Sequence, residues 1–168
     1  WALAKIGQLG TLTRGSGIKR TDIVENGYPC IRYGELYTTY KIAFSSAISH
    51  TTLEIYRNAY KANENDILMT LTGENKKDIS MALAYLGKDQ IAYGGDMTCL
   101  SNHNMNPLYL VYAINSPYGR YCMQQLSTGD IIVHMSNDRL NKIYLPIPPL
   151  NEQKKIVIKA NQIFSLID

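Results

Sequence analysis

Apolar residues in the first two thirds of the chain form short runs of strand length, separated by glycine, proline and polar clusters. The run at 67–71 follows a turn cluster at 63–66, leads into the polar segment 74–78, and is matched by a second run at 81–86. Two such runs around a polar connection predict a hairpin with an exposed, basic tip. Further strands are expected at 4–6, 28–33, 131–133 and 143–145, and those at 91–93 and 97–100 are expected to pair with each other.

Proline marks the start of two expected helices, because its missing N–H and fixed φ suit the first helical turn. Pro107 opens a stretch with apolar residues at helical spacing, and Pro117 opens a second that runs to about Leu126. A helical turn is also expected at 138–141. The segments 13–20 and 34–40 are expected to be loops, and 44–60 is ambiguous.

An amphipathic helix is expected after the proline-rich stretch 146–150, with Asn151 as its cap. Its apolar positions are spaced as in a coiled-coil seam. They are Ile156, Ala160, Ile163 and Ile167, with Val157 and Phe164 widening the stripe. This stripe could pack on its own domain, but its place after a rigid stretch favours a helix that leaves the domain. We therefore predict a recognition unit over 1–150 and the start of a spacer helix over 151–168.

Composition limits the class of protein without naming a function. The chain has 168 residues, 45% hydrophobic and 18% charged, which suits one domain with a buried core. Its net charge of +3 is too small to indicate nucleic-acid binding by itself. The three cysteines form no CxxC pair, and no signal peptide or apolar run of membrane length occurs. We therefore expect a soluble protein of the reducing cytoplasm.

No pattern in the sequence provides a convincing catalytic site. The pair Pro148-Pro149 lacks the preceding Asn or Asp and the following aromatic residue that a base-methylating loop needs, and no glycine-rich nucleotide loop occurs. One alternative is a metal-dependent nuclease built on Asp66, Glu74 and Lys76, since metal-assisted cleavage requires carboxylates close together. That spacing is short, and the pattern arises easily by chance.

Histidines and cysteines offer little more. Cys99 and His103 would supply only half of a zinc site. His134 follows an apolar run and is expected to be a buried, satisfied histidine or part of an interface.

Basic and polar side chains gather on the expected connections between strands. Arg14, Lys19 and Arg20 lie in the glycine-containing segment 13–20, while Lys76 and Lys77 lie at the hairpin tip. Cationic side chains neutralise phosphates, Arg and Lys read guanine edges, and Asn and Gln read adenine. Tyrosine is also over-represented, with 13 residues against 2 Phe and 1 Trp, and its hydroxyl can reach a phosphate or base edge. Each charge alone is typical of a solvated surface, but the joint pattern favours nucleic acid.

The order of several motifs resembles a known family. They are Ile6-Gly7-Gln8-Leu9-Gly10 before the 13–15 loop, GYPCIRY at 27–33 with Glu35-Leu36, NDILMTLTG at 65–73, Ser127-Thr128-Gly129, and LPIPPLNEQKKI at 145–156. The last of these, leading into a helix, is the most specific. Together they resemble a target-recognition domain of a type I restriction–modification specificity subunit. Asn65 departs from the glycine that is usual in the family before the aspartate.

The resemblance implies an α+β fold with mixed twisted sheets and short helices, followed by a C-terminal helix that begins a coiled-coil spacer. It implies no catalysis and no cofactor in this chain, which would read one half of a bipartite double-stranded DNA site. Spacer helices would set the distance between the halves and dock modification subunits. Those partners would bring S-adenosylmethionine and methylate adenine, and a separate restriction subunit would translocate and cut.

Loop position, residue type and the resemblance together nominate the DNA contacts. They are Arg14, Ser16, Lys19 and Arg20 in the first loop; Tyr33, Tyr37 and Thr38 after the second strand; and Thr72, Glu74, Asn75, Lys76 and Lys77 at the hairpin tip. Asn75 and Lys76 are the preferred candidates for base edges, and Glu74 could accept from a cytosine amino group. Lys19, Arg20 and Lys77 are assigned to phosphates.

Two further alternatives concern the C-terminal helix. The chain could be a protein-interaction module that acts through this helix. It could also be a half-length subunit that dimerises through the helix to read a symmetric site.

Overall fold

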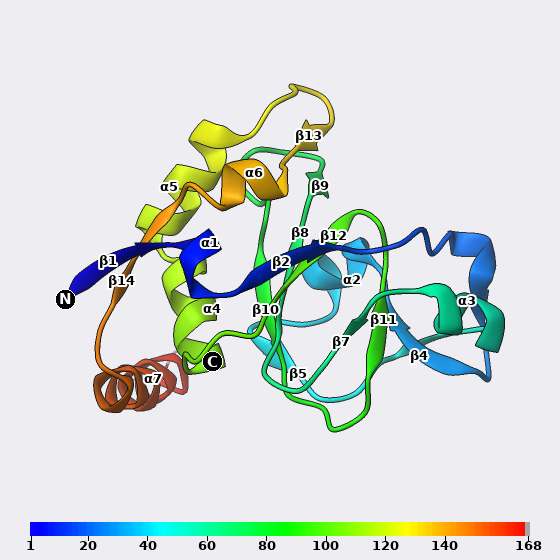
Figure 1. Ribbon diagram of the computed structural model, residues 1–168, viewed down its shortest axis with the longest axis horizontal. Coiled ribbons are helices and arrows are strands. Elements are labelled where there is room, and N and C mark those ends of the chain that lie inside the picture. Colours follow the sequence, from blue (N-terminus) through cyan, green and yellow to red (C-terminus); the bar gives the residue numbers. More distant parts are fainter. Residues whose placement is uncertain (167–168) are drawn as a thin grey trace.

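A computed structural model describes residues 1–166 and shows a mixed α+β fold with two five-stranded sheets (Figure 1). The strands of the first sheet are, in spatial order, β2 (Thr11–Arg14), β12 (Met97–Ser101), β8 (Ile67–Thr70), β10 (Ala82–Tyr85) and β5 (Ala43–Phe44). Those of the second are β3 (Ile23–Val24), β6 (Ser49–Thr51), β4 (Tyr28–Ile31), β11 (Ile91–Tyr93) and β7 (Lys61–Ala62). Two antiparallel pairs stand apart, β1 (Ala2–Lys5) with β14 (Tyr144–Ile147) and β9 (Thr72–Gly73) with β13 (Val133–His134).

The helices are mostly short, and the longest closes the described chain. They are α1 (Ile6–Leu9), α2 (Tyr33–Thr38), α3 (Leu53–Asn58), α4 (Pro107–Asn115), α5 (Pro117–Leu126), α6 (Asn137–Leu140) and α7 (Leu150–Phe164), with a 3-10 turn at Arg20–Asp22. In Figure 1, α4, α5 and α7 lie on one side of β8 and β10, and the second sheet lies on the other. The first sheet is therefore the middle layer of the fold.

Strand β8 shows how one apolar run serves two cores. Ile67 and Met69 belong to the cluster that contains the residues of α4, whereas Leu68 belongs to the cluster that contains Ile31 and Leu36. Successive side chains of a strand point to opposite faces. Because both faces are covered, every residue of β8 is buried, which is why the run has no polar alternation.

The predicted hairpin is confirmed. β8 and β10 pair antiparallel with Leu68 opposite Leu83, and residues 74–77 beyond β9 are exposed. The predicted pairing of 91–93 with 97–100 is wrong. β11 joins β4 and β7 in the second sheet, while β12 lies between β2 and β8 in the first. The turn at 94–96 therefore connects the two sheets. The sequence could not show this, because strands that are buried on both faces carry no signal for their partners.

The two proline-initiated helices begin where expected. The Asn106 side chain accepts a hydrogen bond from the Tyr109 N–H at 3.1 Å, and Ser116 Oγ accepts from the Gly119 N–H at 3.2 Å. These caps satisfy N–H groups that lack a helical partner, and proline follows each cap. The strand at 4–6 and the helical turn at 138–141 are present with shifted bounds, as β1 and α6.

Several expected loops are regular structure. Arg14 ends strand β2 instead of lying in a flexible loop. The segment 33–38 is helix α2, and the ambiguous segment 44–60 divides into β6 and α3, which Thr52 caps. These elements are short, and long-range contacts rather than local propensity stabilise them.

Helix α7 begins at Leu150, and Pro149 rather than the predicted Asn151 occupies the cap position. Gln153 and Val157 are buried against the domain, and the Phe164 ring lies 5.7 Å from the ring of Tyr112 on α4. The described part of the helix therefore packs on its own domain, while Ile163 of the expected seam is 48% exposed. Ile167 lies outside the described residues, and the coiled-coil spacer and the domain boundary at 150 stay predictions. No described helix is long and apolar enough to cross a membrane.

Candidate nucleic-acid interface

A groove of about 980 Å³ runs between the end of β2, the 94–96 turn and helix α2. Five of the predicted contact residues line it: Arg14, Lys19, Arg20, Tyr33 and Thr38. Arg32, Glu35 and Asp96 also line it, and none of them was among the predicted contacts. Four cations thus share the groove with two carboxylates.

A second groove of about 250 Å³ adjoins the first and is lined by part of the hairpin tip. The two grooves share Tyr33, Gly34 and Thr38, and the second adds Tyr37, Glu74, Asn75 and Asp78. Helix α2 is therefore the common wall that brings the three predicted segments together.

The remaining predicted residues flank these grooves. Lys76 and Lys77 are exposed at the hairpin tip. Ser16 Oγ accepts a hydrogen bond from the Tyr60 N–H at 3.3 Å, and Thr72 Oγ1 donates to Asp96 Oδ1 at 3.2 Å. In this structure the hydroxyls of Ser16 and Thr72 are therefore bonded to other parts of the protein.

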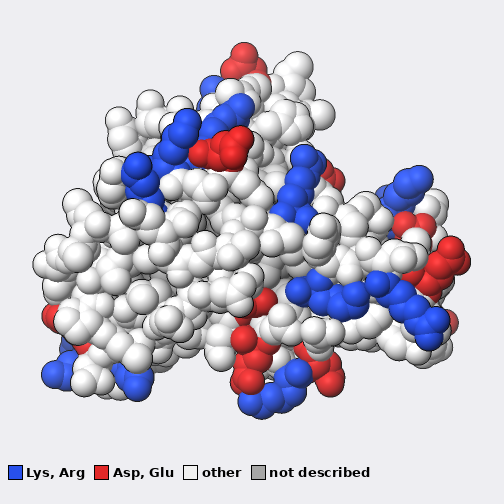
Figure 2. All heavy atoms as spheres, in the orientation of Figure 1, with Lys and Arg blue, Asp and Glu red and all other residues white. Residues whose placement is uncertain are grey.

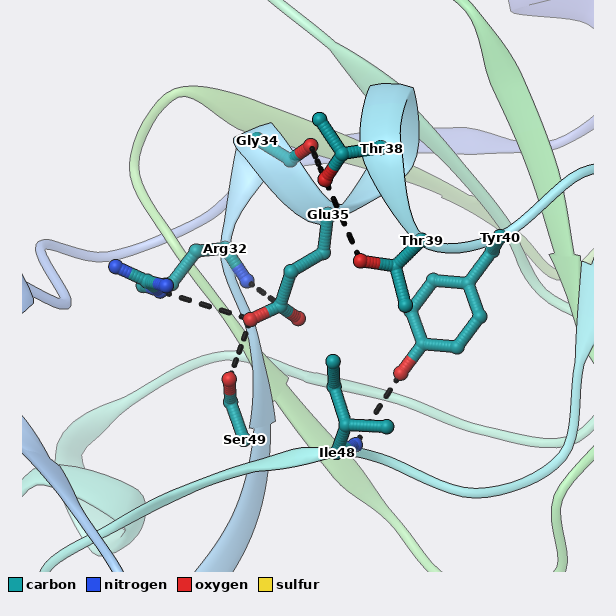
Figure 3. A network of polar contacts seen from close by, with 8 residues as sticks. All are labelled: Arg32, Gly34, Glu35, Thr38, Thr39, Tyr40, Ile48 and Ser49. Atoms are coloured by element: carbon teal, nitrogen blue, oxygen red, sulfur yellow. Dashed lines mark hydrogen bonds and ion pairs between the residues drawn. The ribbon is translucent and has the colours of Figure 1, made fainter.

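A buried carboxylate fixes α2 in this position (Figure 3). Glu35 is 5% exposed, lies 3.6 Å from Arg32 Nε, and accepts hydrogen bonds from the Arg32 N–H at 3.4 Å and from Ser49 Oγ. A glutamate in the first turn that reaches back to the N–H before the helix favours helix initiation. This contact explains why 33–38 is helical despite Gly34, and it holds the Arg32 side chain at the groove wall.

The first loop presents its cations from a fixed backbone. Arg14 Nε donates to the Gly95 carbonyl oxygen at 2.7 Å, and the Lys19 N–H donates to Asp22 Oδ2 at 2.8 Å. The latter bond lies at the start of the 3-10 turn that contains Arg20. The Lys19 and Arg20 side chains are exposed, as suits phosphate contacts.

The hairpin tip is closed by its own side chains. Asn75 Oδ1 accepts from the Asp78 N–H at 2.9 Å, and Asn75 Nδ2 donates to Asp78 Oδ2 at 3.0 Å. Lys76 Nζ lies 3.5 Å from Asp130 Oδ1 on the neighbouring loop. Asn75 would have to release Asp78 to use both amide atoms on a base, whereas the exposed ion pair of Lys76 costs little to break.

Arg120 supports the tip from below, a role that the sequence did not indicate. Its Nη2 donates to the Lys77 carbonyl oxygen at 2.8 Å and to the Ile79 carbonyl oxygen. Burial lowers the pKa of this guanidinium, and Asp78 and Tyr37 oppose the shift. A single arginine on a helix gave no pattern from which this contact could be found.

The Tyr37 hydroxyl points into the scaffold. It lies 2.5 Å from Thr70 Oγ1 and donates to the Thr72 carbonyl oxygen at 3.2 Å. Burial raises its pKa, so the phenol stays protonated. Its ring packs edge-to-face against Tyr33, with centroids 6.5 Å apart. Tyr33 is the more accessible of the two rings for contact with a ligand.

The charges outside the grooves are dispersed. Figure 2 shows basic side chains over α6 and in a row along β7 toward α3, with acidic side chains at the lower edge of the same face. On this face the charges thus form several small groups of both signs.

The alternative catalytic and metal sites are not assembled. Asp66 and Glu74 lie beyond opposite ends of β8, and Asp66 accepts from the Asn63 N–H at 2.8 Å while only 7% exposed. Among residues 1–166, no group of three or more His, Cys, Asp or Glu side chains could hold a metal ion. The nuclease interpretation of Asp66, Glu74 and Lys76 therefore has no geometric support.

The histidine and cysteine contacts also differ from a metal site. His103 Nε2 lies 2.9 Å from the Asn65 carbonyl oxygen, and its Nδ1 accepts from the Met105 N–H at 3.3 Å. Burial raises the pKa of the Cys99 thiol well above its usual value. His134 is exposed, so the expectation of a buried histidine is wrong. Its backbone is held instead: the His134 N–H donates to the Thr128 carbonyl oxygen at 2.7 Å, and its carbonyl oxygen accepts from the Thr128 N–H at 3.0 Å.

Comparison with known families decides the class of protein. The model of the type I restriction modification DNA specificity domain matches residues 1–168. The chain belongs to this family. It is a DNA-sequence specificity domain of a type I restriction–modification specificity subunit, which is not a catalytic subunit.

The similar proteins are longer than this specificity domain. The specificity subunit of the type I restriction enzyme MjaVIII from Methanocaldococcus jannaschii is 29% identical over 160 residues, which cover 93% of the chain and 34% of the relative. The chain thus spans about a third of that curated relative.

Solved structures share the fold at low sequence identity. A chain from a study of complex assembly and conformational transition in a type I restriction–modification system has a TM-score of 0.70 at 16% identity, covering 99% of this chain and 39% of that one. The HsdS subunit from Thermoanaerobacter tengcongensis has a TM-score of 0.64 at 16% identity, covering 99% of this chain and 38% of that one. The S subunit from M. genitalium has a TM-score of 0.60 at 15% identity, covering 98% and 39%.

Proposed function

We propose that this specificity domain reads one half of a bipartite double-stranded DNA site through the two grooves around α2. The proposal rests on the proximity in space of three segments that are far apart in the sequence. Residues 14–20, 33–38 and 72–77 were nominated separately, and they line or flank two grooves that share Tyr33, Gly34 and Thr38.

The roles of the side chains follow from their existing partners. Lys19, Arg20 and Lys77 are exposed, and none of their side chains is bonded to another of residues 1–166. They suit phosphates, which attract cations without demanding one orientation. Lys76 and Glu74 are exposed at the tip and suit base edges in the major groove. Both amide atoms of Asn75 are bonded to Asp78. Unless these bonds break, Asn75 would affect DNA binding only by fixing the shape of the loop.

The reactions belong to partner subunits in this proposal. Modification subunits bind S-adenosylmethionine and methylate adenine, and a restriction subunit translocates and cuts. Helix α7 would be the start of the spacer helix. Its exposed apolar residues, among them Ile158 and Ile163, would contact modification subunits or a second copy of the chain. The complex would act in the cytoplasm, where the host DNA lies.

The test starts from the intact system. Mapping methylated adenines in host DNA gives the bipartite target, and binding of the assembled complex is then measured on target and scrambled duplexes at several salt concentrations. We expect tighter binding to the target and a steep fall of affinity with salt on both duplexes. Replacing Lys19, Arg20 and Lys77 together by Ala should flatten that salt dependence. Affinity that ignores both sequence and salt would contradict the proposal and favour a protein-interaction module.

A further inference from the structure

We infer that Arg14 and Asp96 together read one G·C base pair in the major groove. This inference rests on the proposed function and assigns one base pair to one place in the larger groove, which both residues line. Asp96 was not among the residues nominated from the sequence.

Arg14 is held so that its terminal amino groups stay available. Arg14 lies opposite Thr98 in the β2–β12 pairing, and the Gly15 N–H donates to the Met97 carbonyl oxygen at 2.9 Å. Its Nε donates to the Gly95 carbonyl oxygen at 2.7 Å. That bond uses the inner nitrogen of the guanidinium, and neither Nη atom is bonded to another residue within 1–166. A guanidinium anchored through Nε presents both Nη atoms as a fixed pair of donors.

Asp96 is held by contacts with Leu71 and Thr72. Its Oδ1 accepts from Thr72 Oγ1 at 3.2 Å, and its backbone carbonyl oxygen accepts from the Leu71 N–H at 2.7 Å. The side chain is exposed in the groove. Its Oδ2 is not bonded within the described part of the chain, so one oxygen is anchored and the other is open.

A carboxylate in this place needs a ligand with a donor. Phosphates repel it, and at neutral pH an ionised carboxylate only accepts hydrogen bonds. In the major groove the donors are the amino groups of cytosine and adenine. Glu74 is the other acidic candidate, but no described residue anchors its side chain, and it lines the smaller groove.

The neighbouring arginine selects between those two bases. The major-groove edge of a G·C pair presents two adjacent acceptors, N7 and O6 of guanine, followed by the amino donor of cytosine. Arg14 donates to the carbonyl oxygen of Gly95, the residue before Asp96, so its guanidinium fork and the open carboxylate oxygen would face neighbouring atoms in that order. An A·T pair places its donor between two acceptors and does not match it.

The experiment compares two substitutions in the intact modification complex. Relative affinities are measured on duplexes that vary one base pair at a time across the half-site, for wild type, Arg14→Ala, Asp96→Ala and Asp96→Asn. In wild type we expect one position to prefer G·C by about fivefold to 150-fold. Arg14→Ala and Asp96→Ala should each weaken that preference at the same position and leave the others intact.

Controls separate this outcome from general damage. Asp96→Asn keeps the size of the side chain and can still accept from Thr72, yet it should also lower the G·C preference at that position. Thermal unfolding of each complex shows that it is folded. Lys88→Ala alters an exposed ion pair with Glu64 outside the groove and should change no position.

Three results would overturn the inference: effects at different base pairs, effects at none, or an equal loss on every duplex. The last would mean that Asp96 only holds Thr72 and the turn. If Lys76→Ala still alters sequence preference, these failures leave the proposed function intact. If no groove substitution alters preference, the proposed function fails with it.

Discussion

Arg120 on α5 donates a hydrogen bond of 2.8 Å to the carbonyl oxygen of Lys77 at the hairpin tip. The same Nη2 atom also donates to the Ile79 carbonyl oxygen. A half-buried cation on one element thus sets the shape of an exposed loop on another. If the tip binds DNA as proposed, its conformation there depends on Arg120, a residue that lines neither groove.

Replacing Arg120 by Ala should therefore lower the free energy of unfolding by about 2 kcal/mol, because two carbonyl oxygens lose a charged donor. Chemical denaturation measures the loss. The matched control is Arg57→Ala on α3, where the side chain is exposed and the cost should stay below about 0.5 kcal/mol. Equal losses in the two variants would show that the Arg120 contacts contribute nothing.

The two lysines of the tip should behave differently. Lys77→Ala should weaken binding to all sequences alike and reduce the slope of log affinity against log salt by about 0.9. Lys76→Ala should instead change which sequence is preferred. Equal affinity losses on cognate and scrambled DNA for both variants would reject this division. Asp130→Asn, which removes the ion-pair partner of Lys76, should leave the preference unchanged and is the control.

Burial of His103 predicts a pH dependence of stability. Burial lowers its pKa below the ordinary 6.5, so between the lowered value and 6.5 the unfolded chain binds more protons than the folded chain. Stability then rises with pH in that window. The stability that the neutral form of His103 contributes to folding is complete above about pH 6.5 and is lost as the pH falls below that value. Melting temperatures measured from pH 7.5 to 5.5 should fall, and His103→Gln should flatten that part of the profile. A wild-type curve that is flat over this range would contradict the prediction.

The three cysteines should differ in their reaction with an alkylating reagent. Burial raises the pKa of the Cys30 thiol to about 11 and that of Cys99 well above its usual value, and both side chains are buried. Cys122 on α5 is half-buried. Since the thiolate is the reactive form, Cys122 should be modified first in the folded protein at pH 8, with Cys30 and Cys99 following only after unfolding. Peptide mass mapping over time checks the order, and early labelling of Cys30 would contradict it.

Local signals were sufficient where a residue acts on its own backbone. Asn106 and Ser116 cap helices whose first residue is proline, so the starts of α4 and α5 could be predicted. The β8–β10 hairpin was equally readable, because its turn and both runs are contiguous. The strand at 91–93 was also found, but its partner was not, since pairing with residues 30 and 31 depends on long-range packing.

The same limit applies to the site. Side-chain type and loop position indicated Lys19, Lys76 and their neighbours, and family resemblance supplied the ligand. Nothing in the sequence showed that the Tyr37 hydroxyl turns inward, because that depends on Thr70 from another strand. Asp96 lies between the two expected strands 91–93 and 97–100, and only the approach of Arg14 and Thr72 to the connection gives its carboxylate a place in the groove.

The antiparallel pairing of β1 with β14 sets Ala2 opposite Ile147. The first and last strands of the described fold consequently lie side by side, and all the residues that line the two grooves lie between them in the sequence. A segment closed in this way can be exchanged for another of the same architecture without moving what flanks it.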